Sequence, residues 1–310
     1  MNLVNSISVI IPIVDELESL PGQLQLLTNQ TIMPQEIIFV CAGEIAPIEK
    51  SLKEYNLKKK GLKYKVIYNK DGMPGGNRNI GISAASSDWI AFIDAGIYPE
   101  LNWIESLVKC INKHNVDGVF GTCRFDGNNI LEKAVCSLSY GCNIVLPVLP
   151  SSLFHKNIFS KVGYFSNTLR SGEDILWIRS FENVYGKRVI CENALVNYTH
   201  HPSSLIEICQ KWFLYEKNAV AIGVNKIQQK LLLFFFLAII ITTFFSFTWG
   251  IILFLTYIII RGFIDPIRRS KSIFWYKEKP IAILIPFVIC MLIDFSKLSG
   301  FIIASLKKVK

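Results

Sequence analysis

Asp94 is the first residue whose type and position could do chemistry. It ends a short apolar run, 89–93, with the pattern of a strand buried on both faces of a parallel sheet. Ligands of open α/β sheets bind at the carboxyl ends of such strands, so Asp94 is a candidate for holding a metal ion or a sugar. The alternative is a simple turn, because Ala95 and Gly96 follow. This stretch alone leaves both interpretations open.

A second candidate is the carboxylate pair Glu173 and Asp174, which begins a helix predicted to run through Val184. The helix dipole favours acidic residues in a first turn, and this preference explains the pair without any function. A carboxylate that faces a cleft can instead accept a hydroxyl proton in the transition state, as a general base. We keep both explanations at this point.

The glycine-rich loop 70–76 leads into a helix predicted to start near Asn77. Backbone N–H groups before a helix N-terminus suit a phosphate, and the two glycines leave them accessible. Arg78, placed in the first turn of that helix, is unfavourable next to the positive end of the dipole unless an anion also lies there. The loop therefore predicts a phosphate site.

Alternating strands and helices are expected to position these residues. Such alternation predicts an α/β fold, with a parallel sheet joined by right-handed crossovers. Residues 126–150 are rich in Gly, Asn, Ser and Pro, and we expect a long loop or an interrupted helix that lines an open site. The predicted strands are 7–14, 36–41, 65–68, 89–93, 118–123, 152–155 and 194–198.

The carboxyl-terminal third of the chain is predicted to associate with a membrane. Residues 231–260 contain no charge, and twenty-one of the thirty are Leu, Ile or Phe. Insertion of these side chains favours the bilayer by about 6–12 kcal/mol. Lysines precede this run and arginines follow it, so both ends should lie on one side of the membrane, as in a hairpin that turns near 246–250.

Arms of about fifteen residues are short for full crossings, so a re-entrant hairpin or one packed in a homodimer stays open. Residues 281–306 form another apolar segment, interrupted by charges, which predicts an interfacial or half-inserted helix. Its Asp294 and Lys297 are spaced to pair on one helical face.

The net charge of +9 also belongs to this region. Residues 1–225 carry 21 basic and 21 acidic side chains, whereas 226–310 carry 12 and 3. A nucleic-acid-binding domain would show its basic surplus within the folded part, so no nucleic acid is expected as a partner. The surplus fits anionic membrane lipid instead.

The eight cysteines are scattered, with no CxxC pair and no metal-ligand spacing. Several lie in apolar runs, as buried thiols do. This usage indicates a reducing, cytoplasmic setting. The first residues show no basic region before a signal-type apolar core, so we expect them to belong to the mature fold.

The order of these motifs resembles glycosyltransferase family 2, the inverting nucleotide-sugar transferases of the GT-A fold. The similarity covers about residues 6–215. SVIIPIVDE resembles the family's first strand and the turn after it, NRNIGISAA its Ala-Arg-Asn-x-Gly helix, and WIAFIDAG its Asp-x-Asp motif. VGYF resembles the turn of the acceptor domain, and GED the Glu-Asp motif that carries the base.

The resemblance implies a GT-A fold, with a mixed, mostly parallel sheet flanked by helices, in a catalytic domain of residues 1–225. A membrane-associated region, 226–310, would follow, with the hairpin at about 231–260 and the half-inserted helix at about 281–306. Asp174, with Glu173, would be the catalytic pair. The implied donor-binding residues are Pro12, Asp15, Glu16, Arg78, Asn79 and Asp94.

The resemblance also implies a divalent cation, Mn²⁺ or Mg²⁺, held by Asp94 and His201. The chain departs from the family at two places. Cys41 and Ala42 stand where the family has an acidic pair for the nucleobase, and Gly96 replaces the second aspartate of Asp-x-Asp.

The implied reaction is a single displacement in which Asp174 takes the acceptor's proton and the nucleoside diphosphate leaves. The acceptor would be a lipid-linked saccharide or an oligosaccharide in surface polysaccharide synthesis, at the cytoplasmic face of the inner membrane. Two alternatives remain: an inactive relative that acts as a scaffold for glycan assembly, and a nucleotidyltransferase on a similar sheet. The downstream Glu-Asp helix speaks against the second.

Overall fold

The computed structural model describes residues 4–13, 17–55, 61–224, 226–271 and 279–307. Its centre is one eight-stranded sheet with the order β3-β2-β1-β4-β7-β6-β8-β5. The strands are β1 Ile7–Ile13, β2 Glu36–Cys41, β3 Lys63–Tyr68, β4 Trp89–Phe92, β5 Ile97–Pro99, β6 Gly118–Phe125, β7 Ile144–His155 and β8 Ile190–Tyr198.

The sheet is mixed, with a parallel half formed by the first four strands. β1 pairs in parallel with both β2 and β4, and β2 pairs in parallel with β3. β7 runs antiparallel to β4, and β8 runs antiparallel to β5. The carboxyl ends of β1, β2 and β4 therefore meet at one edge, which confirms the predicted α/β architecture and places Asp94 at that edge.

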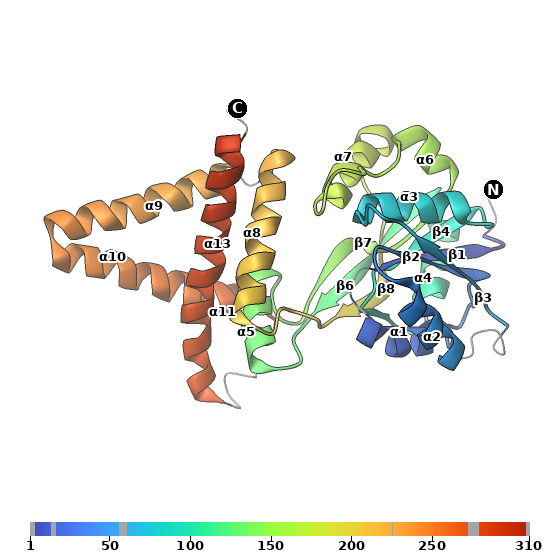
Figure 1. Ribbon diagram of the computed structural model, residues 1–310, viewed down its shortest axis with the longest axis horizontal. Helices are drawn as coiled ribbons and strands as arrows, with labels where there is room; N and C mark the ends of the chain where they lie inside the picture. The colour runs from blue at the N-terminus through green and yellow to red at the C-terminus, as the bar shows by residue number, and fades with distance from the viewer. Residues whose placement is uncertain (1–3, 14–16, 56–60, 225, 272–278, 308–310) are drawn as a thin grey trace. The chain divides into compact units, whose positions relative to one another are not determined.

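Helices cover both faces of the sheet (Figure 1). One face carries α3, α6 and α7, and the other carries α1, α2 and α4. The crossovers between parallel strands need helices on the faces, which explains why β1, β2 and β4 are mostly apolar and buried, whereas the edge strand β3 contains exposed lysines. The helices are α1 Leu20–Leu27, preceded by the 3₁₀ turn η1 Leu17–Ser19, α2 Ile45–Tyr55, α3 Pro74–Ala84, α4 Trp103–His114, α6 Asn157–Val162 and α7 Glu173–Tyr185.

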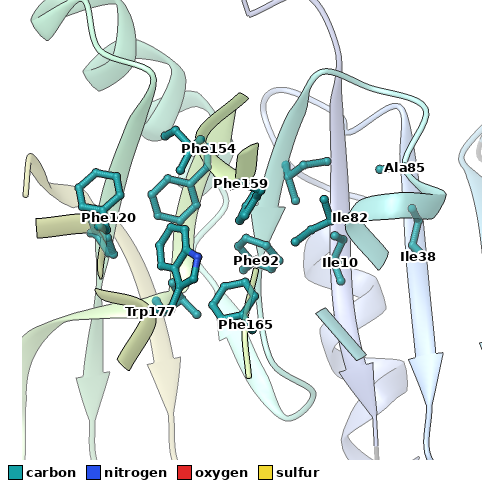
Figure 2. Packing of buried hydrophobic residues seen from close by; sticks show 14 of the residues in the cluster. Ile10, Ile38, Ile82, Ala85, Phe92, Phe120, Phe154, Phe159, Phe165 and Trp177 are labelled. Carbon is teal, nitrogen blue, oxygen red and sulfur yellow. The ribbon is translucent and has the colours of Figure 1, made fainter. Parts of the chain in front are cut away.

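Aromatic side chains fill the layer between the sheet and α6 and α7 (Figure 2). Phe92 on β4 and Phe154 on β7 meet Phe159 on α6. Trp177 on α7 stacks on Phe165, with ring centroids 5.0 Å apart, and its indole N–H donates to the carbonyl of Gly163. This packing fixes the first turn of α7, where the two candidate catalytic carboxylates lie.

The chain forms two compact units. The first holds residues 1–124 and 145–198 and therefore most of the sheet. The second holds residues 125–144 and 199–310, with α5 Ile130–Ser139, α8 Leu205–Ala221, α9 Lys226–Phe245, α10 Phe247–Ile259, the π-helical segment η3 Ile260–Ile264, α11 Asp265–Arg269, η4 Pro280–Leu284 and α13 Ile285–Lys307. The functional division into 1–225 and 226–310 stays a prediction, and the compact units divide the chain at other residues.

Three helices of the second unit are long and apolar enough to cross a membrane: 226–245, 247–269 and 282–306. The first two form the predicted hairpin, which turns at Ser246. Its arms have 20 and 23 residues, so the prediction of two short arms was wrong. Each arm extends beyond the uncharged run: the first arm begins at Lys226, and the second continues through Arg261.

Two local predictions also need correction. Residues 126–150 contain the regular helix α5 and the first half of β7 rather than a long loop. Helix α3 begins at Pro74, three residues earlier than predicted, with the proline at its first position. Proline is well suited to that position because its fixed φ is helical and it lacks an N–H that would go unpaired.

Candidate active site

Asp94 follows β4 at the carboxyl edge of the sheet, and its side chain is 34% exposed. Gln23 of α1 holds this turn, because its amide nitrogen donates to the carbonyls of Asp94 and Ile97, both at 2.8 Å. Gly96 has a φ of +78°, a left-handed conformation that lets the chain reverse into β5. The backbone of Asp94 thus takes part in the turn while its carboxylate stays partly exposed, and its role as a ligand stays a prediction.

Arg78 lies at the centre of the site and is almost fully buried. One guanidinium nitrogen donates to Asp94 Oδ1 at 2.7 Å, and the other donates to Glu173 Oε1 at 2.5 Å. The guanidinium also lies over the ring of Phe165. Two carboxylates from distant parts of the chain therefore lie beside Arg78, and the phosphate site predicted at this helix stays a prediction.

Glu173 and Asp174 are adjacent in sequence but have different surroundings. Glu173 is buried and shares the inner face of α7 with Trp177 and Phe181, which follow at intervals of four residues. Burial raises the pKa of Glu173, the charge of Arg78 lowers it, and the charge of Asp174 raises it, with a net shift upward. Asp174 is half-buried, and its Oδ1 accepts from the N–H of Ile175. Only Asp174 of the pair is open to an acceptor.

Asn79 connects the glycine-rich helix to the turn before α7. Its amide nitrogen donates to the carbonyl of Phe165 and to Asn167 Oδ1, and its oxygen accepts from the N–H of Phe165. The helix approaches this turn closely, because a Cβ on Gly75 would lie 2.1 Å from the carbonyl oxygen of Ser166. Asn79 therefore holds helix α3 against the turn before α7. Its predicted contact with a donor stays a prediction.

The model of glycosyl transferase family 2 matches residues 8–192, more than half of the chain. This chain belongs to glycosyl transferase family 2. The match includes the Arg78 helix, the Asp94 turn and the Glu173-Asp174 helix, so the cluster is built from segments that the family model covers.

Two curated relatives are similar over part of their length. An uncharacterized glycosyltransferase of Rickettsia bellii (strain RML369-C) is 27% identical over 197 residues, which cover 58% of this chain and 27% of that protein. Glycosyltransferase AglE of Haloferax volcanii is 26% identical over 186 residues, covering 56% of this chain and 60% of that protein. The chain thus spans less than two thirds of the length of either relative.

The fold is also similar to that of a solved structure, S. aureus TarS 1-349 in complex with UDP-GlcNAc. The TM-score is 0.51 at 14% sequence identity, over 95% of this chain and 91% of that chain. At this identity the likeness concerns the fold, and it confirms the GT-A architecture expected from the sequence.

The family resemblance pointed to further donor-binding residues around β1 and β2. Pro12 lies on β1 opposite Val40, beyond the four residues of β1 that pair with β4. Asp15 and Glu16 lie outside the described residues. Cys41 ends β2 and is fully buried, and burial raises the pKa of its thiol to about 11. A buried neutral thiol cannot replace the acidic pair that it displaces.

The described residues contain no group of three or more His, Cys, Asp and Glu side chains arranged to hold a metal ion. Asp94 has one oxygen bound to Arg78, and Oδ2 takes no hydrogen bond from the part of the chain that the structure describes. A single open carboxylate oxygen provides too few ligands for a resident metal ion. It is better suited to a cation that a bound donor also holds.

His201, the other predicted metal ligand, belongs to the second compact unit. It is buried, and its ring lies 6.0 Å from that of Tyr140. Burial and the charge of Lys211 lower the pKa of His201 to about 3, so the ring is neutral at physiological pH. Its role as a metal ligand stays a prediction.

Three residues that position the site were not found from the sequence. Gln23 orients the Asp94 turn, Asn77 bridges Asn69 and the carbonyl of Val40, and Arg170 donates to the carbonyl of Gly72 in the glycine-rich loop. Gln23 and Asn77 are polar residues with no exposed surface. Asn77 could have been found as part of the NRN stretch, whereas Gln23 lies in an ordinary amphipathic pattern and gave no signal.

Proposed function

We propose that this protein is an inverting glycosyltransferase that moves a sugar from a nucleotide-diphosphate donor to a hydroxyl of a lipid-linked or glycan acceptor. Family membership supports the reaction class. The observation that carries the proposal is the cluster around Arg78, where two carboxylates, Asp94 and Asp174, are open beside a buried, fixed positive charge at the carboxyl edge of the sheet.

In the proposed reaction, Asp174 accepts the proton of the acceptor hydroxyl as the oxygen attacks the anomeric carbon. The bond from that carbon to the diphosphate breaks on the opposite side, so the configuration inverts. Negative charge then grows on the diphosphate near Arg78, whose guanidinium is already held in place and needs no reorganisation. Glu173 takes no proton in this scheme; it holds Arg78.

A donor diphosphate brings its own oxygen ligands for a divalent cation. Mn²⁺ or Mg²⁺ would be held by these oxygens and by Asp94 Oδ2, and it would neutralise charge on the leaving group. The TarS structure with UDP-GlcNAc makes a nucleotide sugar the first donor class to test. Recognition of the base is expected to differ from the family pattern, because Cys41 is buried and neutral.

The membrane part of the proposal rests on the three apolar helices and on the basic surplus after residue 225. We infer attachment to the inner membrane, with the transferase unit in the cytoplasm and an acceptor in surface polysaccharide synthesis. Packing of two hairpins in a homodimer stays part of the proposal as one way to cover the apolar helices.

The test is a transfer assay on the purified full chain with a panel of nucleotide sugars, after a thermal-shift screen with and without Mn²⁺ or Mg²⁺. Ligands that bind only the folded state raise its stability, so the screen selects the donor. Asp174→Asn should lower turnover by about 10²–10⁴-fold, the usual contribution of a general base, while donor binding persists. Glu182→Gln, on the exposed side of the same helix, is the matched control.

Unchanged turnover in Asp174→Asn would remove this residue from the role of base. Silence of the wild-type protein with every donor and acceptor would favour the scaffold alternative instead. One observation supports that alternative: Gly96 and Cys41 leave the site without acids that the family usually has at these places.

A further inference from the structure

Gln23 is a polar residue at a core position of helix α1, where the local pattern favours an apolar side chain. The other core positions of this helix are Leu20, Leu24 and Leu27, and Gln23 lies on the same face as they do. Its side chain has no exposed surface. Burying an amide costs stability unless its polar atoms are hydrogen-bonded, so a buried glutamine among leucines points to a specific role.

Only one end of the Gln23 amide has hydrogen-bond partners. The nitrogen donates to the carbonyls of Asp94 and Ile97, both at 2.8 Å. The oxygen is buried and accepts no hydrogen bond from the part of the chain that the structure describes. An unpaired buried oxygen is unfavourable, and an apolar side chain at this position would avoid it. Both donor hydrogens of the amide therefore go to one target, the turn that carries Asp94.

That turn consists of Asp94, Ala95, Gly96 and Ile97. The N–H of Ile97 donates to the carbonyl of Asp94 at 3.2 Å, and Gly96, with a φ of +78°, has the conformation that the third residue of a type II turn requires. The two bonds from Gln23 are shorter than this one backbone bond. Because Gln23 bridges the first and the last carbonyl of the turn, it fixes the backbone from which the Asp94 side chain projects.

The carboxylate of Asp94 depends on this backbone because the protein holds it at one oxygen. Oδ1 accepts from Arg78 at 2.7 Å, and the side chain is 34% exposed. Oδ2 is the oxygen that the proposed function gives to a cation shared with the donor diphosphate. Its position is set by the turn and by the contact with Arg78 together, so loosening the turn lowers the fraction of molecules in which Oδ2 is correctly placed.

We propose that Gln23 is a positioning residue that holds the Asp94 turn in its donor-binding conformation before the donor arrives. This inference rests on the proposed function, which gives Asp94 its role in donor binding. When only a fraction of the molecules has the binding conformation, the apparent Kd rises in inverse proportion to that fraction, while the bound state itself is unchanged. Gln23 therefore acts on the affinity for the donor rather than on the transfer step.

The test compares glutamine-to-methionine variants of the full chain in detergent, because methionine has a similar length but no hydrogen-bond donor. Gln23→Met should raise the Kd for UDP-GlcNAc with Mn²⁺, measured by calorimetry, about tenfold, with transfer at saturating donor within about twofold of wild type. If the thermal-shift screen selects another nucleotide sugar, that compound replaces UDP-GlcNAc in every arm.

Two other glutamines of the same region are matched controls. Gln30 is also buried and also donates to two backbone carbonyls, those of Leu26 and Glu100, neither of which lies in the turn. Gln25 lies on the exposed side of α1. Gln30→Met and Gln25→Met should both keep the wild-type Kd. Gln30→Met should lower the unfolding midpoint, and it thereby separates a loss of stability from a loss of donor affinity.

A second measurement reports on the turn directly and needs no donor. Amide hydrogen exchange in a peptide that spans residues 94–99 should be faster in Gln23→Met than in wild type, because the N–H of Ile97 is then protected by a looser turn. Exchange in β1 and β4 should be unchanged, which shows that the variant is folded. If Gln23→Met yields too little folded protein, Gln23→Asn takes its place, since its amide is one methylene too short to bridge both carbonyls.

The inference is overturned if Gln23→Met binds UDP-GlcNAc as tightly as wild type, or if Gln30→Met weakens binding by the same factor. Weaker binding without faster exchange at 94–99 would also overturn it, because Gln23 would then act by another route. Failure of the proposed function looks different. If the wild-type protein binds the donor but transfers sugar to no acceptor, the transferase proposal fails, and the ratio of the two Kd values still decides the role of Gln23.

Discussion

Each compact unit contains an arginine between two aspartate or glutamate side chains, and the two clusters differ in how completely their carboxylate oxygens are used. In the first unit, Arg78 binds Asp94 and Glu173, and Asp94 keeps one oxygen open to solvent. In the second unit, Arg261 binds Asp294 through two hydrogen bonds and also binds Asp265.

The cluster of the second unit has no oxygen left over. Asp294 also accepts from the hydroxyl of Tyr257, and Asp265 also accepts from Arg268 and Arg269. The remaining donors of this cluster reach the end of α5, where Arg269 donates to the carbonyl of Ser139. A saturated cluster of this kind fastens helices together, whereas an unsaturated one can receive a ligand. Saturation of the carboxylate oxygens, rather than charge, therefore distinguishes the two arginine clusters.

Neutralising one aspartate in each cluster tests this difference most directly. Asp294→Asn removes a buried carboxylate and leaves Arg261 with Asp265 as its remaining acidic partner, and we expect a loss of about 3 kcal/mol in stability. Asp94→Asn affects a partly exposed carboxylate and should cost less than about 1 kcal/mol. Transfer should respond the other way, with a loss of about 10²-fold for Asp94→Asn and little change per folded molecule for Asp294→Asn.

The measurements are the unfolding midpoint in detergent and the rate of sugar transfer. Asp88→Asn is the matched control, because Asp88 is exposed at the amino end of the strand that Asp94 follows. If Asp94→Asn destabilises as much as Asp294→Asn while transfer persists, both clusters are structural and the distinction is wrong.

Glu36 tests whether saturation predicts a structural role within the first unit as well. Its Oε1 accepts from Ser8 and twice from Ser86, and its Oε2 lies 3.0 Å from the ammonium group of Lys65. Burial raises the pKa of Glu36, but these hydrogen bonds outweigh it and lower the pKa from 4.5 to about 2. We therefore expect Glu36→Gln to cost about 1–3 kcal/mol at neutral pH.

The sign of the pH dependence follows from the lowered pKa. The folded state binds the proton less readily than the unfolded state, so the stability from Glu36 is complete above pH 4.5 and is lost as the pH falls towards 2. The difference in unfolding free energy between wild type and Glu36→Gln should shrink over this range. A difference that does not change with pH would show that the carboxylate charge is not the cause.

Much of the first cluster could be predicted from the sequence, because each part lies where a local signal ends. Asp94 follows a strand, Glu173 and Asp174 begin a helix, and Arg78 follows a glycine pair. What could not be predicted is that Arg78 joins Asp94 to Glu173, a contact across 95 positions of sequence. No spacing rule covers such a contact, since it depends on the aromatic packing that sets α7 against α3.

The second cluster was harder to predict for the same reason. The spacing of Asp294 and Lys297 predicted a local pair, but Asp294 instead binds Arg261, and Lys297 lies over the ring of Trp212. In an apolar setting, a bidentate guanidinium offers a carboxylate more hydrogen bonds than a neighbouring ammonium on the same helix. The helical pattern of α5 was present in the sequence, but the flanking Gly and Asn residues hid it.

Glu173→Gln tests the role of Glu173 in the Arg78 cluster of the first unit. Glu173 contacts Arg78 rather than the reacting atoms, so its neutralisation should lower transfer only about tenfold, equal to about 1.4 kcal/mol. The pKa of Glu173 is raised by burial, and wild-type stability should therefore fall as the pH rises above 4.5. The glutamine variant should lack this slope. If transfer falls as far as in Asp174→Asn, Glu173 takes part in the chemistry itself.

Tyr257→Phe should have the smallest effect and gives the closest test of saturation. The variant removes the 3.0 Å hydrogen bond to Asp294 Oδ2, but that oxygen keeps its bond from Arg261. We expect a loss of about 0.5–1.5 kcal/mol in the unfolding free energy in detergent, the value of one hydrogen bond among several. Tyr164→Phe, at an exposed tyrosine, is the control and should be neutral.

On the Asp294→Asn background, the loss from Tyr257→Phe should shrink if the hydroxyl acts through the carboxylate charge. An undiminished loss would mean that Tyr257 stabilises the helices by packing alone, and the cluster would then consist of the arginines and aspartates only.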